Sequence, residues 1–131
     1  MEPIKIITDF LDNRFGDIRS LYQLNMFINE CKLPPIVRDN NKFEHINVQI
    51  LLYVLLVKFQ NIKLKDQEIR NISTRIRKLF PEFTFADIYY IFSNTKKCNY
   101  GILYYTQVYD KIMHWFNKHQ DEKIIYMHLV E

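Results

Sequence analysis

Apolar residues recur at helical spacing along most of the chain, and few glycines or prolines interrupt them. The stripe of the first predicted helix, over residues 3–15, consists of Ile4, Ile7, Phe10 and Leu11. These positions lie on one side of a helix, so the segment is expected to pack that side inward. Gly16 is expected to end this helix, and Asp17 to cap a second helix that stops at the double proline 34–35.

The middle of the chain joins a polar segment to a strongly apolar one. Residues 36–42 are polar and typical of an exposed loop. Residues 44–60 are apolar nearly all round, and their periodicity fits either a buried strand or a buried helix. Seventeen residues without glycine or proline exceed an ordinary strand, so we predict a helix at the buried centre of the fold.

Residues 66–80 have the clearest amphipathic pattern. The inner stripe is formed by Ile69, Ile72, Ile76 and Leu79. Cations occupy the opposite side, and Asp66 is the expected cap. The sequence therefore predicts a helix with one buried side and one basic side.

Thr84 is the predicted N-cap of an aromatic helix, with Asp87 at the third helical position. A polar turn over residues 94–99 follows, and a long helix is expected to start near Thr106. The tail, residues 121–131, fits either a continued helix or a short strand. The pattern as a whole predicts an all-α fold, a compact bundle of five or six helices in a single domain over residues 1–131.

Composition supports a packed core, because 48% of the 131 residues are hydrophobic. The longest fully apolar run, Ile50 to Val57, is too short to cross a membrane, and the first residues lack the pattern of a signal peptide. The two cysteines, Cys31 and Cys98, lie far apart and favour reduced thiols. A cytoplasmic location without membrane contact is therefore expected.

Catalytic and cofactor motifs are not evident in the sequence. Two isolated glycines cannot build a phosphate-binding loop. Asp110 and His114 stand one helical turn apart, but two ligands fall short of a structural zinc site, and a solvated pair is the simpler interpretation. Cys98 and His114 lack a third group that would orient them as nucleophile and base. We expect neither an enzyme nor a bound metal or cofactor.

Positive charge is concentrated between residues 58 and 97. This stretch contains nine Lys or Arg residues and four acidic residues, which gives it a net charge of +5, whereas the net charge of the whole chain is +3. A solvated helix surface is the simpler interpretation of these cations. The alternatives are contact with nucleic acid, for which clustered cations beside an aromatic ring are suited, and contact with an anionic protein partner. The candidate nucleic-acid-binding residues are Arg70, Arg75, Arg77, Lys78, Lys96, Lys97 and Tyr100.

Tyrosine is abundant, with nine residues in the chain. Core packing can account for any one of them, but so many exceed what one small core is expected to bury. Tyrosine combines an apolar ring with a polar tip and is enriched at protein interfaces. The candidate protein-interface residues are Tyr104, Tyr105 and Tyr109.

A wider motif runs through the second half of the chain. It has an amphipathic helix, a proline–aromatic step, a helix from an Asp–hydrophobic pair to a Phe, a basic turn ending in Tyr–Gly, and a Trp-containing helix. The residues that carry it are Pro81, Asp87, Ile88, Phe92, Lys96, Lys97, Tyr100, Gly101, Asp110, Ile112 and Trp115. On this pattern, residues 58–122 resemble a group of small proteins from phages and mobile elements of Bacteroidetes, although Cys98 stands where that group usually has glycine.

The resemblance implies a phage or mobile-element accessory protein, which would act in the host-cell cytoplasm, and it implies no particular activity. Together with the tyrosines, it favours a non-enzymatic module that binds a protein partner in replication, assembly or host takeover. The alternative is a replication accessory protein that binds nucleic acid through its basic helix. The sequence identifies neither the partner nor the oligomeric state.

Overall fold

Six α-helices follow one another along the described residues, which confirms the predicted all-α fold. The computed structural model describes residues 2–36, 42–43, 46–97 and 104–130. The helices are α1 (Glu2–Phe15), α2 (Leu21–Cys31), α3 (Val48–Leu55), α4 (Asp66–Leu79), α5 (Phe85–Ser93) and α6 (Tyr105–Val130). A π-helical segment, Leu56–Gln60, continues α3, and two-residue strands β1 (Lys42–Phe43) and β2 (Ile46–Asn47) pair antiparallel.

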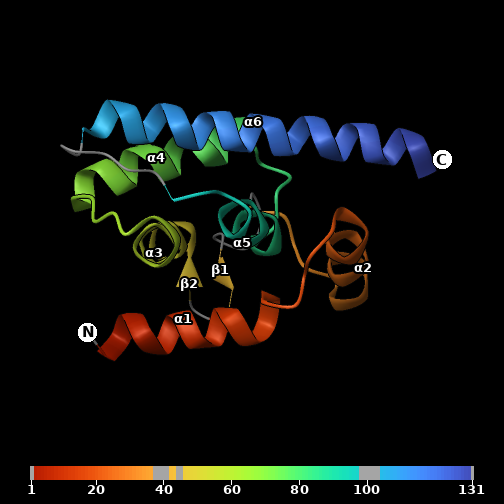
Figure 1. Ribbon diagram of the computed structural model, residues 1–131, viewed down its shortest axis with the longest axis horizontal. Coiled ribbons are helices and arrows are strands. Elements are labelled where there is room, and N and C mark those ends of the chain that lie inside the picture. The colour runs from red at the N-terminus through yellow and green to blue at the C-terminus, as the bar shows by residue number, and fades with distance from the viewer. Residues whose placement is uncertain (1, 37–41, 44–45, 98–103, 131) are drawn as a thin grey trace.

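The helices form three levels, with α3 and α5 in the middle (Figure 1). Helix α1 runs along one side and α6 along the opposite side, whereas α3 and α5 are seen end-on between them. Helix α3 contacts α1, α4 and α5, and α5 also contacts α1, α2 and α6. The middle pair therefore connects the outer helices.

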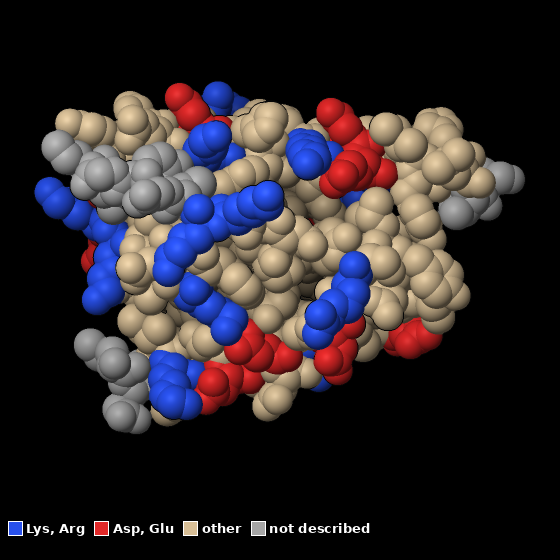
Figure 2. All heavy atoms as spheres, in the orientation of Figure 1, with Lys and Arg blue, Asp and Glu red and all other residues tan. Residues whose placement is uncertain are grey.

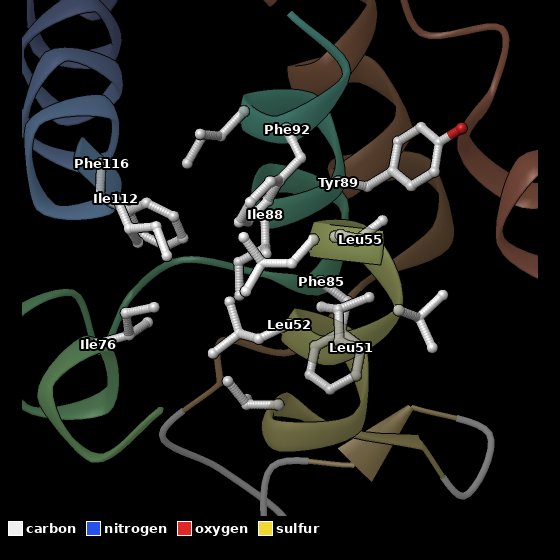
Figure 3. Packing of buried hydrophobic residues seen from close by; sticks show 14 of the residues in the cluster. Leu51, Leu52, Leu55, Ile76, Phe85, Ile88, Tyr89, Phe92, Ile112 and Phe116 are labelled. Carbon is white, nitrogen blue, oxygen red and sulfur yellow. The ribbon is translucent and has the colours of Figure 1, made fainter. Parts of the chain in front are cut away.

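The core lies where α3, α5 and α6 meet (Figure 3). Leu52 and Leu55 of α3 point toward Phe92 of α5, and Ile112 and Phe116 of α6 close the cluster from the other side. All five side chains are fully buried. Their burial confirms the segment before residue 60 as the centre of the fold, since apolar area removed from water is the main stabilising term.

The central helix begins later than predicted. Asn47, not Glu44, precedes its first turn, and the Asn47 side chain accepts a hydrogen bond of 2.8 Å from the Ile50 N–H. Glu44 and His45 lie outside the described residues. The predicted exposed loop 36–42 also needs correction at its first residue, because Ile36 is buried and its N–H donates to the Phe83 carbonyl at 2.7 Å.

Two helix caps differ from the prediction. Ser20 caps α2 in place of Asp17, accepting a hydrogen bond of 3.1 Å from the Gln23 N–H. Helix α4 is preceded by Lys65, and Asp66 is its first helical residue. At the start of α4 the bond that forms runs the other way, because the Lys65 N–H donates to the Glu68 carboxylate at 3.0 Å.

Helix α2 ends at Cys31, before the double proline that was expected to stop it. The residue that ends it is Lys32, whose φ of 53° lies in the left-handed region. Its N–H donates to the Ile28 carbonyl and closes the last turn. Glycine is the usual residue at this position, because a Cβ atom makes the left-handed conformation unfavourable.

Lys32→Gly is therefore expected to raise the free energy of unfolding by about 0.5–1 kcal/mol, since it removes the cost of a left-handed side chain. Urea denaturation monitored by circular dichroism measures the difference. Asn29→Gly, at an exposed position inside the same helix, is the matched control. It should lower the free energy of unfolding by about 0.3–0.5 kcal/mol, the difference between the helix propensities of asparagine and glycine. A Lys32→Gly protein that is also destabilised would contradict the assigned cap.

The tail continues α6 as a helix to Val130, which settles the two alternatives left open by its sequence. Near this end, apolar side chains of the helix are exposed to solvent. Ile124, Ile125, Met127 and Leu129 are each more than half exposed. In Figure 2 the end of the molecule where α2 and the last turns of α6 lie carries few charges.

Candidate functional site

A buried carboxylate joins α5 to α6. Asp87 is fully buried in the first turn of α5, where it forms a reciprocal cap with Thr84. The Thr84 N–H and hydroxyl donate to one Asp87 carboxylate oxygen at 2.8 and 3.0 Å, and the Asp87 N–H donates back to the Thr84 hydroxyl oxygen at 3.2 Å. The predicted N-cap at Thr84 is thus confirmed, and the second carboxylate oxygen is left for other partners.

That second oxygen contacts two basic residues of α6. His119 Nε2 and Lys123 Nζ each lie 2.9 Å from Asp87 Oδ1. Burial by itself would raise the pKa of Asp87, but the hydrogen bond from His119 and the charge of Lys123 outweigh it and hold the pKa below the ordinary 3.8. Asp87 is therefore a stable anion that fixes α6 on α5.

His119 is only 3% exposed, and aromatic rings hold it on two sides. The Phe83 ring lies edge-on at 5.2 Å between centroids, and the Tyr90 ring lies at 5.6 Å. The sequence did not reveal this cluster, because Asp87 lies more than 30 residues from both His119 and Lys123. One signal was present, since His119 falls three residues after the apolar Phe116 and so lies on the same side of the helix.

A second cluster of polar side chains, partly buried at the edge of the core, connects α1 to α5. The Tyr89 hydroxyl donates to Asp12 at 2.7 Å, and Lys58 forms an ion pair with the same carboxylate at 2.9 Å. Burial and then the Asp12 contact raise the pKa of Tyr89 well above 10. The Tyr89 hydroxyl therefore stays protonated and hydrogen-bonded. The cluster is a structural link between helices and offers no free group for chemistry.

A shallow hollow between α4 and α6 brings together residues from both predicted sites. Arg75 Nε donates to the Tyr109 hydroxyl at 3.0 Å, and the Tyr105 and Tyr109 ring centroids lie 5.9 Å apart. The volume of the hollow is about 400 Å³. Its lining is Asn71, Arg75, Tyr105, Thr106, Tyr109 and Asp110, and we call it the tyrosine hollow.

The tyrosines differ in their exposure. Tyr104 is 52% exposed just before α6, whereas Tyr105 and Tyr109 are half-buried against α4. Burial and the neighbouring Tyr109 raise the pKa of Tyr105, so its hydroxyl remains protonated at neutral pH. The three residues predicted as an interface are thus neighbours in sequence, and two of them form one surface with Arg75.

The predicted basic residues do not share one surface. Arg70, Arg75 and Lys78 are exposed on α4, but Arg77 is half-buried and its Nε has no hydrogen-bond partner among the described residues. Leu79, expected on the inner stripe of this helix, is 43% exposed, and Phe80 is buried in its place.

The remaining basic candidates follow α5. Lys96 and Lys97 are exposed there, and Lys96 lines a groove against α6 that contains no α4 residue. Tyr100 lies outside the described residues, as does Cys98. Figure 2 shows Lys and Arg side chains over the part of this face where α6 and the chain leaving α5 lie.

Metal-binding geometry is not found within the part of the chain that the structure describes, where no three His, Cys, Asp or Glu residues gather around a common point. Asp110 and His114 are both exposed. Over the same residues, none of the helices has the length and apolar character needed to cross a membrane.

Comparison of the chain with known protein families, with curated proteins and with solved structures finds no match. The resemblance to proteins of Bacteroidetes phages and mobile elements therefore stays a prediction. The function has to be argued from the surfaces described above.

Proposed function

We propose that this protein is a non-enzymatic protein-binding module and that a partner protein docks on the tyrosine hollow. The observation that carries the proposal is the hydrogen bond from Arg75 to Tyr109 beside the Tyr105 ring. Tyrosine and arginine are the residue types that most often dominate binding energy at protein interfaces. Here they line a hollow of about 400 Å³ into which a partner side chain fits.

Preorganisation strengthens this argument. Binding costs free energy for every flexible side chain that becomes ordered, and that cost is smaller when the side chain is already held. The Arg75 guanidinium is fixed by the Tyr109 hydroxyl, and Tyr109 is fixed by Tyr105. The hollow thus presents two rings and a cation in a defined arrangement before any partner arrives.

The setting we propose is that of a phage or mobile-element accessory protein that acts on a replication, assembly or host protein. The resemblance of residues 58–122 supports this setting. The surplus of tyrosines near the start of α6 supports the binding role.

A photo-crosslinking amino acid at Thr106 tests the docking site. Thr106 lines the hollow and is exposed, and Asn13 on α1, on the opposite side of the molecule, is the matched control position. We expect a partner that crosslinks from Thr106 and not from Asn13. Tyr105→Ala should then weaken its affinity about 30-fold, the loss typical of an interface hot spot.

Two results would overturn this proposal. One is the same set of crosslinked proteins from both positions. The other is an unchanged affinity of the captured protein for Tyr105→Ala, measured by calorimetry with purified components. Circular dichroism of the variant separates loss of binding from loss of structure.

The second candidate function is nucleic-acid binding through α4. The observation in its favour is that Arg70, Arg75 and Lys78 are exposed on one helix. Arg77 does not belong in a test of this surface, because its buried Nε makes charge reversal there a structural change. Arg70→Glu with Lys78→Glu is the appropriate double variant.

A further inference from the structure

A groove between the end of α5 and the middle of α6 forms a second candidate site, independent of the tyrosine hollow. Its volume is about 400 Å³, within the range of small-molecule sites. Side chains from 90–96 form one wall and side chains from 111–122 the other. No residue of the tyrosine hollow belongs to it.

The charge of this groove is positive. Lys96, Lys111 and Lys118 line it, and Glu122 is the single acidic side chain among the described residues of its lining, which leaves an excess of +2 (three minus one) with histidine neutral. A cleft lined by one sign of charge concentrates ions of the opposite sign. The groove is therefore suited to an anion.

Two of these lysines are available to a ligand. Lys111 and Lys118 are exposed, and neither has an ion-pair partner within the described residues. They stand seven residues apart on α6 with His114 between them, so all three side chains project from one side of the helix over about 10 Å. This row of nitrogen donors matches an extended or multiply charged anion.

Aromatic rings lie among the cations. Trp115 and Tyr90 both line the groove and are half-buried. The Trp115 ring packs edge-on against Phe92 at 5.9 Å, and Tyr90 packs against His119. Since each ring is held from behind by the protein, stacking a base on it costs little side-chain entropy.

The polar groups on the α5 side serve the fold and not the ligand. The Asn94 side chain donates to the Tyr90 carbonyl at 2.8 Å, and the Thr95 hydroxyl donates to the Phe92 carbonyl at 2.7 Å. Buried Gln60, at the end of the π-helical segment, donates to the Thr95 hydroxyl oxygen and to the Lys96 carbonyl. The wall that carries Lys96 is thereby fixed.

We infer that this groove binds one nucleotide unit, with the lysines on its phosphate and the Trp115 ring against its base. Cations alone would suit any anion, and rings alone would suit any flat molecule. A nucleotide, free or within a single strand, is the ligand class that uses both.

The single tryptophan of the chain provides a direct test, because a base stacked on Trp115 quenches its emission. The probes are inorganic phosphate, adenosine monophosphate and a short oligothymidylate, each titrated at low salt. We expect saturable quenching by both nucleotides. Tighter binding of the oligothymidylate would identify a single strand as the ligand, and equal binding per nucleotide would identify a free nucleotide.

Charge reversal locates the site. Lys111→Glu with Lys118→Glu is expected to weaken binding at least 10-fold, because two phosphate contacts become repulsive. The matched control is Arg19→Glu with Lys63→Glu, which changes the net charge by the same amount at exposed positions outside the groove and outside α4, and should weaken binding less than about 3-fold. All four side chains are exposed, and circular dichroism checks that both variants are folded.

Three outcomes would overturn the inference. They are no saturable quenching by either nucleotide, quenching that phosphate alone reproduces in full, and an equal loss of affinity in the two double variants. The last would make binding a general effect of net charge. None of these outcomes bears on the crosslinking test of the tyrosine hollow.

Discussion

Asp87→Ala is expected to lower the free energy of unfolding by about 3–5 kcal/mol, the range for removing one partner of a buried ion pair. The substitution leaves the buried His119 without the acceptor of its 2.9 Å hydrogen bond and Lys123 without its counter-ion. It also removes the acceptor of both Thr84 hydrogen bonds at the start of α5. Urea denaturation at neutral pH measures the loss.

Asp110→Ala is the matched control for this experiment. Asp110 lies on α6, is exposed and has no ion-pair partner among the described residues, so its loss should change the free energy of unfolding by less than about 0.5 kcal/mol. Similar losses for the two variants would contradict the assigned role of Asp87.

The pH dependence of the same difference has a definite sign. The pKa of Asp87 is lower in the folded protein than the ordinary 3.8 of an unfolded chain. Its ionised form therefore stabilises the fold in full above that ordinary value, and the stabilisation is lost as the pH falls toward the folded pKa. The deficit of Asp87→Ala should therefore shrink as the pH falls below about 4.

Phe116→Ala is expected to cost about 3–5 kcal/mol of stability, because it empties a site at the centre of an aromatic cluster. Phe116 is fully buried, with ring centroids of Phe80, Phe83 and Phe92 at 5.5, 5.9 and 6.2 Å. These neighbours come from different segments and cannot all move inward to fill the space. Thermal and urea denaturation both report the loss.

Two controls separate this cavity effect from a general sensitivity of α6. Phe116→Leu keeps most of the volume and should cost no more than about 1.5 kcal/mol. Leu129→Ala removes a side chain that is 79% exposed and should cost less than about 0.5 kcal/mol. An equal cost for all three would contradict the described core.

Those parts of the fold that depend on neighbouring residues were predictable from the sequence. Thr84 and Asp87 stand three residues apart before an apolar stripe, which is sufficient to place the start of α5. The stripe of α4 likewise follows from its own spacing over Ile69, Ile72 and Ile76, but not at Leu79, where the helix ends.

Choices between equivalent local signals were not predictable. Asp17 and Ser20 are both good N-caps, and the turn before α2 selects Ser20. The π-helical segment gives no pattern of its own, and it ends at Asn61, whose φ of 56° lies in the left-handed region. The starts of α3 and α4, next to Asn47 and Lys65, also differ from the predicted ones, because several neighbouring polar residues can precede a helix equally well.

Surfaces that are formed jointly by two helices could be predicted only in part from the sequence. The sequence indicated Arg75 and Tyr109 as members of different sites, and the packing of α4 on α6 unites them. It also indicated Thr84 and Asp87 as a cap, but not the partners that α6 brings to the same carboxylate. The sequence does not distinguish Lys111 and Lys118 from ordinary surface lysines, so the groove that they line was not predicted.

The fold makes different demands on the two parts of α6. Up to Lys123, each inward side chain contacts the core or Asp87, so replacements there are limited by the stability of the fold. Beyond it, Ile124, Ile125, Met127 and Leu129 are mostly exposed, and the fold does not require them to be apolar. Their identities are thus free to follow whatever molecule touches this end, without cost to the rest of the protein.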